Sequence, residues 1–200
     1  MIKFILVLIL LPFSAFGLEL KIGDIILQPL QCWTCHLIMA QEKSPFSHMG
    51  LVVSTRPEVL VAESLGSVKL TSLKEFLGRT KGQHHSVKRF KDASVVQYFR
   101  QHEKQFLKFF QDHYEGLPYD PEFLWENVNG NGQEKLYCSE MIAKLLEEFL
   151  RIEMPLKKMK YDINREHWIE YFKGNPPDGK WGNAPADFER SLLFYEVGQL

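Results

Sequence analysis

The sequence has little net charge, no internal repeat and no low-complexity linker. Its 24 Lys and Arg residues nearly balance 25 Asp and Glu residues, and the resulting net charge is −1. A chain with this charge balance does not have the excess of positive charge that is typical of nucleic-acid-binding proteins. Apolar residues make up 45% of the 200 residues, which is enough for a packed core and excludes a disordered chain. We therefore expect a single folded domain.

Long apolar runs are also missing, apart from the stretch Phe4–Phe13 near the N-terminus. This stretch is too short to cross a membrane comfortably. It follows Lys3, and small residues precede a possible cleavage point after Gly17, as in a secretory signal peptide. The alternative is an uncleaved anchor at a membrane surface. We expect residues 1–17 to be a signal peptide, residues 18–200 to be the mature domain, and the protein to be exported, either periplasmic or secreted.

Cysteine is scarce, with three residues: Cys32, Cys35 and Cys138. An odd number in an exported protein leaves at least one thiol unpaired within the monomer. The two near neighbours, Cys32 and Cys35, could bridge to each other. That pairing would leave Cys138 free.

The segment Cys32–His36 matches the Cys-x-x-Cys-His attachment pattern of c-type haem. Two thioethers would hold the porphyrin, His36 would be the proximal ligand, and export would suit this chemistry. Against this reading, the pattern is short and lies between two predicted strands. A local disulfide and free thiols are the other interpretations, while a thioredoxin-like redox role lacks its βαβ context.

The stretch that follows Cys138 has the spacing of a half-buried helix. Apolar residues recur there at intervals of three and four positions: Met141, Ile142, Leu145, Leu146, Phe149 and Leu150. Cys138 therefore falls in or just before the first helical turn. The positive end of the helix dipole favours a thiolate there, and the free backbone N–H groups can hold an oxyanion. The alternative is a buried, unreactive cysteine.

Two predicted strands form a β-hairpin in the first half of the chain. They cover Phe46–Val53 and Glu58–Glu63, and the turn-like link Ser54–Pro57 joins them. A four-residue loop would pair Val53 with Glu58. The register then follows by counting back along both strands.

In that register His48 lies opposite Glu63 on the same face of the hairpin. A carboxylate in this position could orient the imidazole, and Gly50 would leave the face beside His48 open. The alternative is an ordinary His–Glu pair on a solvated face.

The clearest helix covers Ser94–Tyr114, with a capping box of Ser94 and Gln97 at its start. One stripe of this helix consists of Val95, Phe99, His102, Phe106, Phe110 and His113, which we interpret as core packing.

Further strands are predicted at 23–28, 85–91 and 191–197. A short helix is predicted at 35–41, and a strand end followed by a helix is predicted over 69–76. The neighbouring His84 and His85 are expected to be loop residues, because no further ligand lies at metal-binding spacing. We expect no metal and no cofactor.

A thiolate, an imidazole and a carboxylate are the parts of a cysteine hydrolase. Their order here is His48, Glu63, Cys138, whereas in papain-like enzymes the cysteine precedes the histidine. On this basis the sequence resembles the permuted papain-like amidases of the YiiX/YaeF type, relatives of the NlpC-type cell-wall amidases. The resemblance rests on an ordered set of short blocks at 23–26, 47–50, 61–68, 70–73, 116–120 and 137–140.

The resemblance implies an α+β fold, circularly permuted and papain-like (NlpC-like), with an antiparallel sheet packed against the helix that carries the cysteine. It implies Cys138 as nucleophile, His48 as base and Glu63 as the residue that orients the base. It also implies hydrolysis of amide or ester bonds. The sequence leaves the substrate open among cell-wall peptides, lipid-linked amides and small acyl amides. Tyr119, Asp120 and Tyr137 are candidates for substrate contacts. The alternatives are the haem protein and a catalytically inactive binding module of the same fold.

Overall fold

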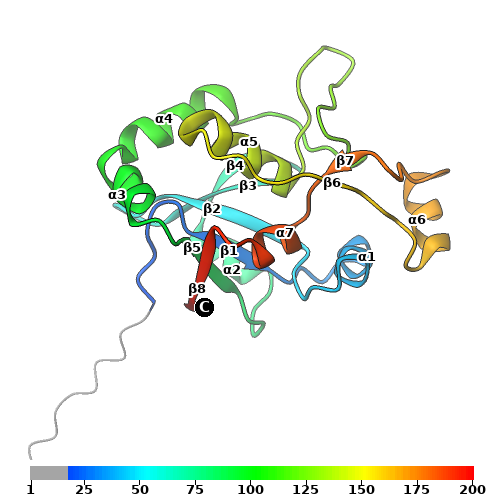
Figure 1. Cartoon of the computed structure of the whole chain (residues 1–200), viewed down its shortest axis with the longest axis horizontal. Coiled ribbons are helices and arrows are strands. Elements are labelled where there is room, and N and C mark those ends of the chain that lie inside the picture. The colour runs from blue at the N-terminus through cyan, green and yellow to red at the C-terminus, as the bar shows by residue number, and fades with distance from the viewer. Residues whose placement is uncertain (1–17) are drawn as a thin grey trace, which may run out of the picture.

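A computed structural model describes residues 18–200 (Figure 1). The predicted signal peptide, residues 1–17, lies outside these described residues. The central element is a six-stranded antiparallel sheet with the strand order β4-β3-β2-β1-β5-β8. Its strands are β1 (Ile25–Gln28), β2 (His48–Ser54), β3 (Leu60–Leu65), β4 (Ser67–Ser72), β5 (Ser86–Phe90) and β8 (Phe194–Gln199). Within residues 18–200 no helix combines the length and the apolar character needed to span a membrane.

One face of the sheet carries the main core. Three helices pack on this face: α3 (Ala93–Gln101), α4 (Glu103–His113) and α5 (Cys138–Leu150) (Figure 1). Alternate residues of β2, namely Met49, Leu51 and Val53, are fully buried against them. The α5 residues of the same core are Met141, Ile142, Leu145 and Leu146. The spacing that predicts the helix thus also supplies the contacts that hold its first residue, Cys138, at the sheet.

The opposite face of the sheet is covered by the short helix α2 (Leu73–Gly78). Phe76 of α2 is fully buried against Val61 and its neighbours in the sheet. Gly50 makes this close packing possible, since a Cβ atom there would lie 2.3 Å from Val61 and 2.8 Å from Phe76. The prediction that Gly50 leaves an open face beside His48 is therefore wrong, because Val61 and Phe76 fill that space.

The register of the β2–β3 hairpin differs from the predicted one. Leu51 pairs with Ala62, whereas the predicted register would pair Leu51 with Leu60. The link between the strands is longer than predicted and covers residues 55–59, and a bulge lies between Val52 and Ser54. A bulge inserts one extra residue into one strand, which a count of loop residues cannot anticipate.

The shift amounts to two residues, so it preserves the face on which each side chain lies. His48 and Glu63 are diagonal neighbours across the strands and are not directly opposite one another. Diagonal neighbours remain within reach of long side chains. The predicted contact therefore forms through a different register.

The predicted helix Ser94–Tyr114 is two helices, α3 and α4, which are separated at His102. The predicted capping box is also wrong, because Asp92 is the N-cap and accepts a hydrogen bond from the backbone N–H of Ser94 at 2.8 Å. The break lets both halves bury aromatic rings. Phe99 and Phe106 are both fully buried, with ring centroids 4.8 Å apart.

The chain after residue 151 contains α6 (Arg165–Phe172), α7 (Pro185–Arg190) and the small sheet of β6 (Lys157–Lys158) and β7 (Trp181–Gly182). Helix α6 lies beside α1 (Trp33–Glu42) at one end of the molecule (Figure 1). A second apolar cluster joins these parts and consists of Leu37, Phe123, Tyr137, Met159, Tyr161, Trp168 and Ala184. This cluster borders the cavity described next.

Candidate active site

Cys138 is the first residue of α5, after the extended N-cap residue Tyr137. It is the one free cysteine of the three, and its exposed fraction is 8%. The first N–H groups of a helix have no partner within the helix and point out of its N-terminus. Cys138 therefore has the predicted position, beside free N–H donors and the positive end of the helix dipole.

His48, the first residue of β2, is buried beside Cys138. Its Nε2 atom lies 2.7 Å from Oε2 of Glu63. This contact leaves Nδ1 as the ring nitrogen that can serve the thiol. Burial of the ring works against its charge, but hydrogen bonds with the Cys138 thiol and the Glu63 carboxylate outweigh burial and raise the pKa of His48 to about 9.

Glu63 is fully buried, and its carboxylate accepts hydrogen bonds from three side chains. His48 and Nη1 of Arg79 both contact Oε2, each at 2.7 Å. Oε1 accepts from Thr71 Oγ1 at 2.5 Å and from Nη2 of Arg79. Burial opposes the charge of Glu63, but the bonds from His48 and Arg79 outweigh it and lower the pKa of Glu63 to about 2.

Arg79 follows α2 directly, and sequence reasoning did not find it. The signal that could have found it is the burial of Glu63, since a buried carboxylate needs a compensating cation. The short helix predicted over 69–76 ends near Arg79. Its direction relative to the sheet, which brings the guanidinium to Glu63, depends on the packing of Phe76 and could not be read from local sequence.

Cys138 and His48 line a cavity of about 470 Å³. Its lining is mostly apolar, with several aromatic rings. The apolar and aromatic lining residues include Leu30, Ile38, Tyr119, Phe123, Tyr137, Met159, Tyr161, Trp168 and Tyr171. Two of the predicted substrate-contact residues, Tyr119 and Tyr137, thus border the cavity together with Cys138.

Asp120, the third predicted substrate-contact residue, does not line this cavity. Its fully buried carboxylate accepts hydrogen bonds from the backbone N–H groups of Glu122 and Leu124, and from Asn127 Nδ2. Asp120 therefore shapes the loop that precedes α5. Its carboxylate makes its hydrogen bonds with other residues of that loop.

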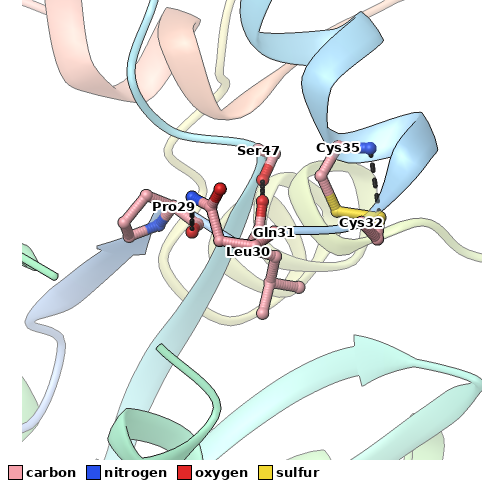
Figure 2. Close-up of a disulfide and its surroundings, with 6 residues drawn as sticks. All are labelled: Pro29, Leu30, Gln31, Cys32, Cys35 and Ser47. Atoms are coloured by element: carbon pink, nitrogen blue, oxygen red, sulfur yellow. Dashed lines mark hydrogen bonds between the residues drawn. A yellow bond between two sulfur atoms is a disulfide. The ribbon is translucent and has the colours of Figure 1, made fainter. Parts of the chain in front are cut away.

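Cys32 and Cys35 form a disulfide at the N-terminus of α1, with Cα atoms 4.8 Å apart (Figure 2). The Cys32 sulfur also accepts a hydrogen bond from the Cys35 backbone N–H at 3.0 Å. Ser47, the residue before His48, donates to the Leu30 carbonyl at 3.3 Å and so links the disulfide loop to β2 (Figure 2). Because both sulfur atoms are joined to each other, they are not available for thioether bonds to haem.

Three further residues of the cavity, all within the last fifty positions of the sequence, could not be predicted from it. Tyr161, Trp168 and Asn183 all line the cavity. Helix α6 packs against α1, and Tyr161 and Trp168 share an apolar cluster with Leu37 of α1. These long-range contacts have no local sequence signature.

The fold and the site define a class of protein. A free cysteine begins a helix, that helix packs on an antiparallel sheet, and a buried histidine of the sheet lies beside the cysteine. This is the arrangement of papain-like cysteine hydrolases, with the histidine placed first in the chain.

The chain belongs to the permuted papain-like amidase enzymes of the YaeF/YiiX type, the C92 family, whose family model matches residues 19–185. The predicted family, fold class and enzyme class are thereby confirmed. The chain is a member of a family of cysteine amidases.

Two similar proteins come from Escherichia coli. The uncharacterized protein YiiX of strain K12 is 26% identical over 164 residues, which cover 81% of this chain and 76% of YiiX. The crystal structure of yiiX from strain O157:H7, described as a metalloprotein, superposes with a TM-score of 0.73 at 23% identity. That match covers 90% of this chain and 97% of yiiX, and it shows a shared fold.

The description of yiiX as a metalloprotein prompts a test of the donor atoms in this chain. Among residues 18–200, no three or more His, Cys, Asp or Glu side chains group closely enough to hold a metal ion. His85, next to His84 as predicted in a loop, has its Nε2 atom 2.6 Å from Thr80 Oγ1. The described residues do not fit a metal site, and we assign no step to one.

Proposed function

We propose that this protein is an exported cysteine hydrolase that cleaves amide or ester bonds through an acyl-enzyme. Cys138 is the nucleophile, His48 the base and Glu63 the residue that orients the base. The observation that carries the proposal is the buried series Cys138, His48, Glu63, in which Cys138 and His48 line a cavity large enough for a small substrate and Glu63 contacts His48.

The acylation step follows from this geometry. The Cys138 thiolate attacks the substrate carbonyl carbon, a C–S bond forms, and the carbonyl electrons move onto oxygen. When these electrons return, the C–N bond breaks and the leaving nitrogen takes the proton from His48 Nδ1. Glu63 holds the imidazole in the required orientation and stabilises its charged form throughout.

Deacylation uses the same residues in reverse. A water molecule gives a proton to the now neutral His48, and its oxygen attacks the acyl carbon. The C–S bond then breaks, the carboxylic acid leaves and the Cys138–His48 pair is restored. An ester substrate follows the same steps with an alcohol as the leaving group.

The apolar lining of the cavity supports a substrate with an apolar acyl group. A lipid-linked amide provides such a group, and so does a cell-wall peptide with an apolar side chain next to the scissile bond. The N-terminal segment supports export. The Cys32–Cys35 disulfide also supports it, since disulfides persist mainly in oxidising compartments.

The test uses p-nitrophenyl esters and p-nitroanilides of straight acyl chains and of short peptides, with mass spectrometry of the protein after rapid acid quenching. We expect one acyl group on the peptide that contains Cys138, and none on Cys138→Ala. Turnover should be lost in His48→Ala and kept in His84→Ala, its matched control in an exposed loop. Wild-type protein that neither acylates nor turns over any of these probes would contradict the proposal and favour a binding module.

A further inference from the structure

Asn183 lies between β7 and α7, and its backbone is held by the two residues on either side of Cys138. The Asn183 N–H group donates a hydrogen bond to Tyr137 Oη at 3.2 Å. Its carbonyl accepts a hydrogen bond from Ser139 Oγ at 3.3 Å. Both bonds are buried, so the position of Asn183 is fixed relative to the nucleophile.

The close approach of this segment depends on Gly182. A Cβ atom at position 182 would lie 3.0 Å from Tyr137 Oη and 2.9 Å from Met159. A larger residue at position 182 would press against both side chains, so the glycine favours the approach of the Asn183 backbone to Tyr137.

The side chain of Asn183 makes no hydrogen bond within the described part of the chain. Its exposed fraction is 2%, it lines the same cavity as Cys138, and neither Nδ2 nor Oδ1 has a hydrogen-bond partner. Buried amide groups in folded proteins are almost always paired. An amide that is buried, unpaired and next to a cavity is therefore available to a ligand in that cavity.

Two other residues that line the cavity share this property. Tyr161 Oη and Trp168 Nε1 are also buried without a partner. Unpaired polar groups thus gather around this cavity. Of these three residues, Asn183 is the one whose backbone is hydrogen-bonded to both neighbours of Cys138.

We propose that Asn183 is a catalytic residue, whose side-chain N–H donates to the carbonyl oxygen of the substrate as that oxygen gains negative charge. This inference rests on the proposed function, because it requires attack by Cys138. The second donor is a free backbone N–H group in the first turn of α5. No proton is transferred, and the hydrogen bond strengthens as the tetrahedral intermediate forms.

The test compares Asn183→Ala and Asn183→Asp with the wild type on the best p-nitroanilide probe. Loss of one oxyanion donor lowers kcat by about 10²- to 10³-fold in comparable sites. We expect a loss of that size for Asn183→Ala. The loss should be larger for Asn183→Asp, because an ionised carboxylate repels the developing charge. Asn131→Ala, in an exposed loop, is the matched control and should keep the wild-type kcat.

Alkylation of Cys138 by iodoacetamide separates this role from a structural one. Alkylation displaces iodide and creates no oxyanion, so its rate should be the same in Asn183→Ala and in the wild type. If Asn183→Ala slows alkylation as much as hydrolysis, or if it keeps kcat within about threefold of the wild type, the assignment is wrong. Loss of turnover in Cys138→Ala tests the proposed function separately from these outcomes.

A second variant keeps the test decisive if Asn183→Ala folds poorly. Tyr137→Phe retains the aromatic ring but removes the oxygen that accepts the Asn183 N–H. We expect a smaller loss of kcat than for the isosteric Asn183→Asp, and no additional loss when Tyr137→Phe is combined with Asn183→Asp. Independent, multiplicative losses would show that Tyr137 does not act by positioning Asn183, and a wild-type kcat in Asn183→Asp would overturn the inference.

Discussion

Glu63 combines its proposed role in orienting His48 with an ion pair to Arg79. Its two oxygens accept hydrogen bonds from three side chains, and no solvent reaches it. The pair of Glu63 and Arg79 carries no net charge. Arg79 thus lets a carboxylate stay ionised in the protein interior, where an isolated charge would be costly.

Glu63→Gln tests the orienting role. The amide keeps the size of the side chain but removes the charge that stabilises the His48 imidazolium, so kcat should fall by about 10²- to 10⁴-fold. The melting temperature should also fall, because Arg79 loses its buried anionic partner. Glu58→Gln, in the exposed link between β2 and β3, is the control and should change neither value. A near-wild-type kcat for Glu63→Gln would mean that His48 is oriented by another group.

The titration of His48 predicts a pH dependence of stability. Folding raises its pKa from 6.5 to about 9, so its protonation stabilises the folded state fully below pH 6.5. This contribution is lost as the pH rises from 6.5 through 9. The melting temperature of the wild type should therefore fall, relative to that of His48→Gln, across this range. Parallel melting curves for the two proteins from pH 6 to 10 would contradict the shift, and His84→Gln should follow the wild type.

The elements show which parts of the fold could be predicted. The helix after Cys138 was found because its apolar spacing continues for several turns and coincides with its buried face. The β2–β3 hairpin was found from its apolar strands and its turn. Its register was not, because neither the longer link nor the bulge near Val52 leaves a mark in the sequence. The break at His102 was missed because no proline or glycine marks it.

The site was predicted in part for a related reason. Cys138, His48 and Glu63 belong to residue types and local patterns that carry chemistry. Arg79 and Asn183 reach the same site only through packing between elements that are distant in sequence. Local sequence patterns do not predict such contacts.

Gly50→Ala tests how closely α2 must approach the sheet. The added methyl group would meet Val61 at 2.3 Å and Phe76 at 2.8 Å, so α2 must move away from the sheet. Overpacking of this kind typically costs about 1–3 kcal/mol. The variant should melt at a lower temperature and lose activity, because Arg79 follows α2 directly and would move with it.

The matched control for this change is Gly78→Ala. Gly78 is the last residue of α2, and nothing lies within 4 Å of the position that its Cβ atom would occupy. Thermal denaturation and turnover of both variants provide the comparison. Equal behaviour of Gly50→Ala and Gly78→Ala would show that the packing of α2 tolerates this volume.

At the scale of the whole molecule, the three cysteines predict a simple labelling pattern. We expect the exported protein to begin at Leu18, after cleavage behind Gly17. Denatured without a reductant, it should take up one iodoacetamide group, on Cys138. After reduction it should take up three, since the Cys32–Cys35 bridge is then open.

The protein is produced in a strain competent in cytochrome c maturation, and its intact mass is measured. This measurement tests the cleavage, the labelling and the absence of haem together. A larger mass that includes residues 1–17 would exclude cleavage. An added haem on the peptide that contains Cys32 and Cys35 would restore the redox alternative.

The permuted order of the site residues determines the order in which they are synthesised. A ribosome makes His48, Glu63 and Arg79 first, Cys138 much later, and Asn183 and the sheet strand β8 near the end of the described chain. A nascent chain therefore has the proposed base before it has the nucleophile, and the nucleophile before the proposed oxyanion donor. On the proposed function, a hydrolase built in this order cannot attack the amides of the cell that makes it until Cys138 and then Asn183 have been synthesised.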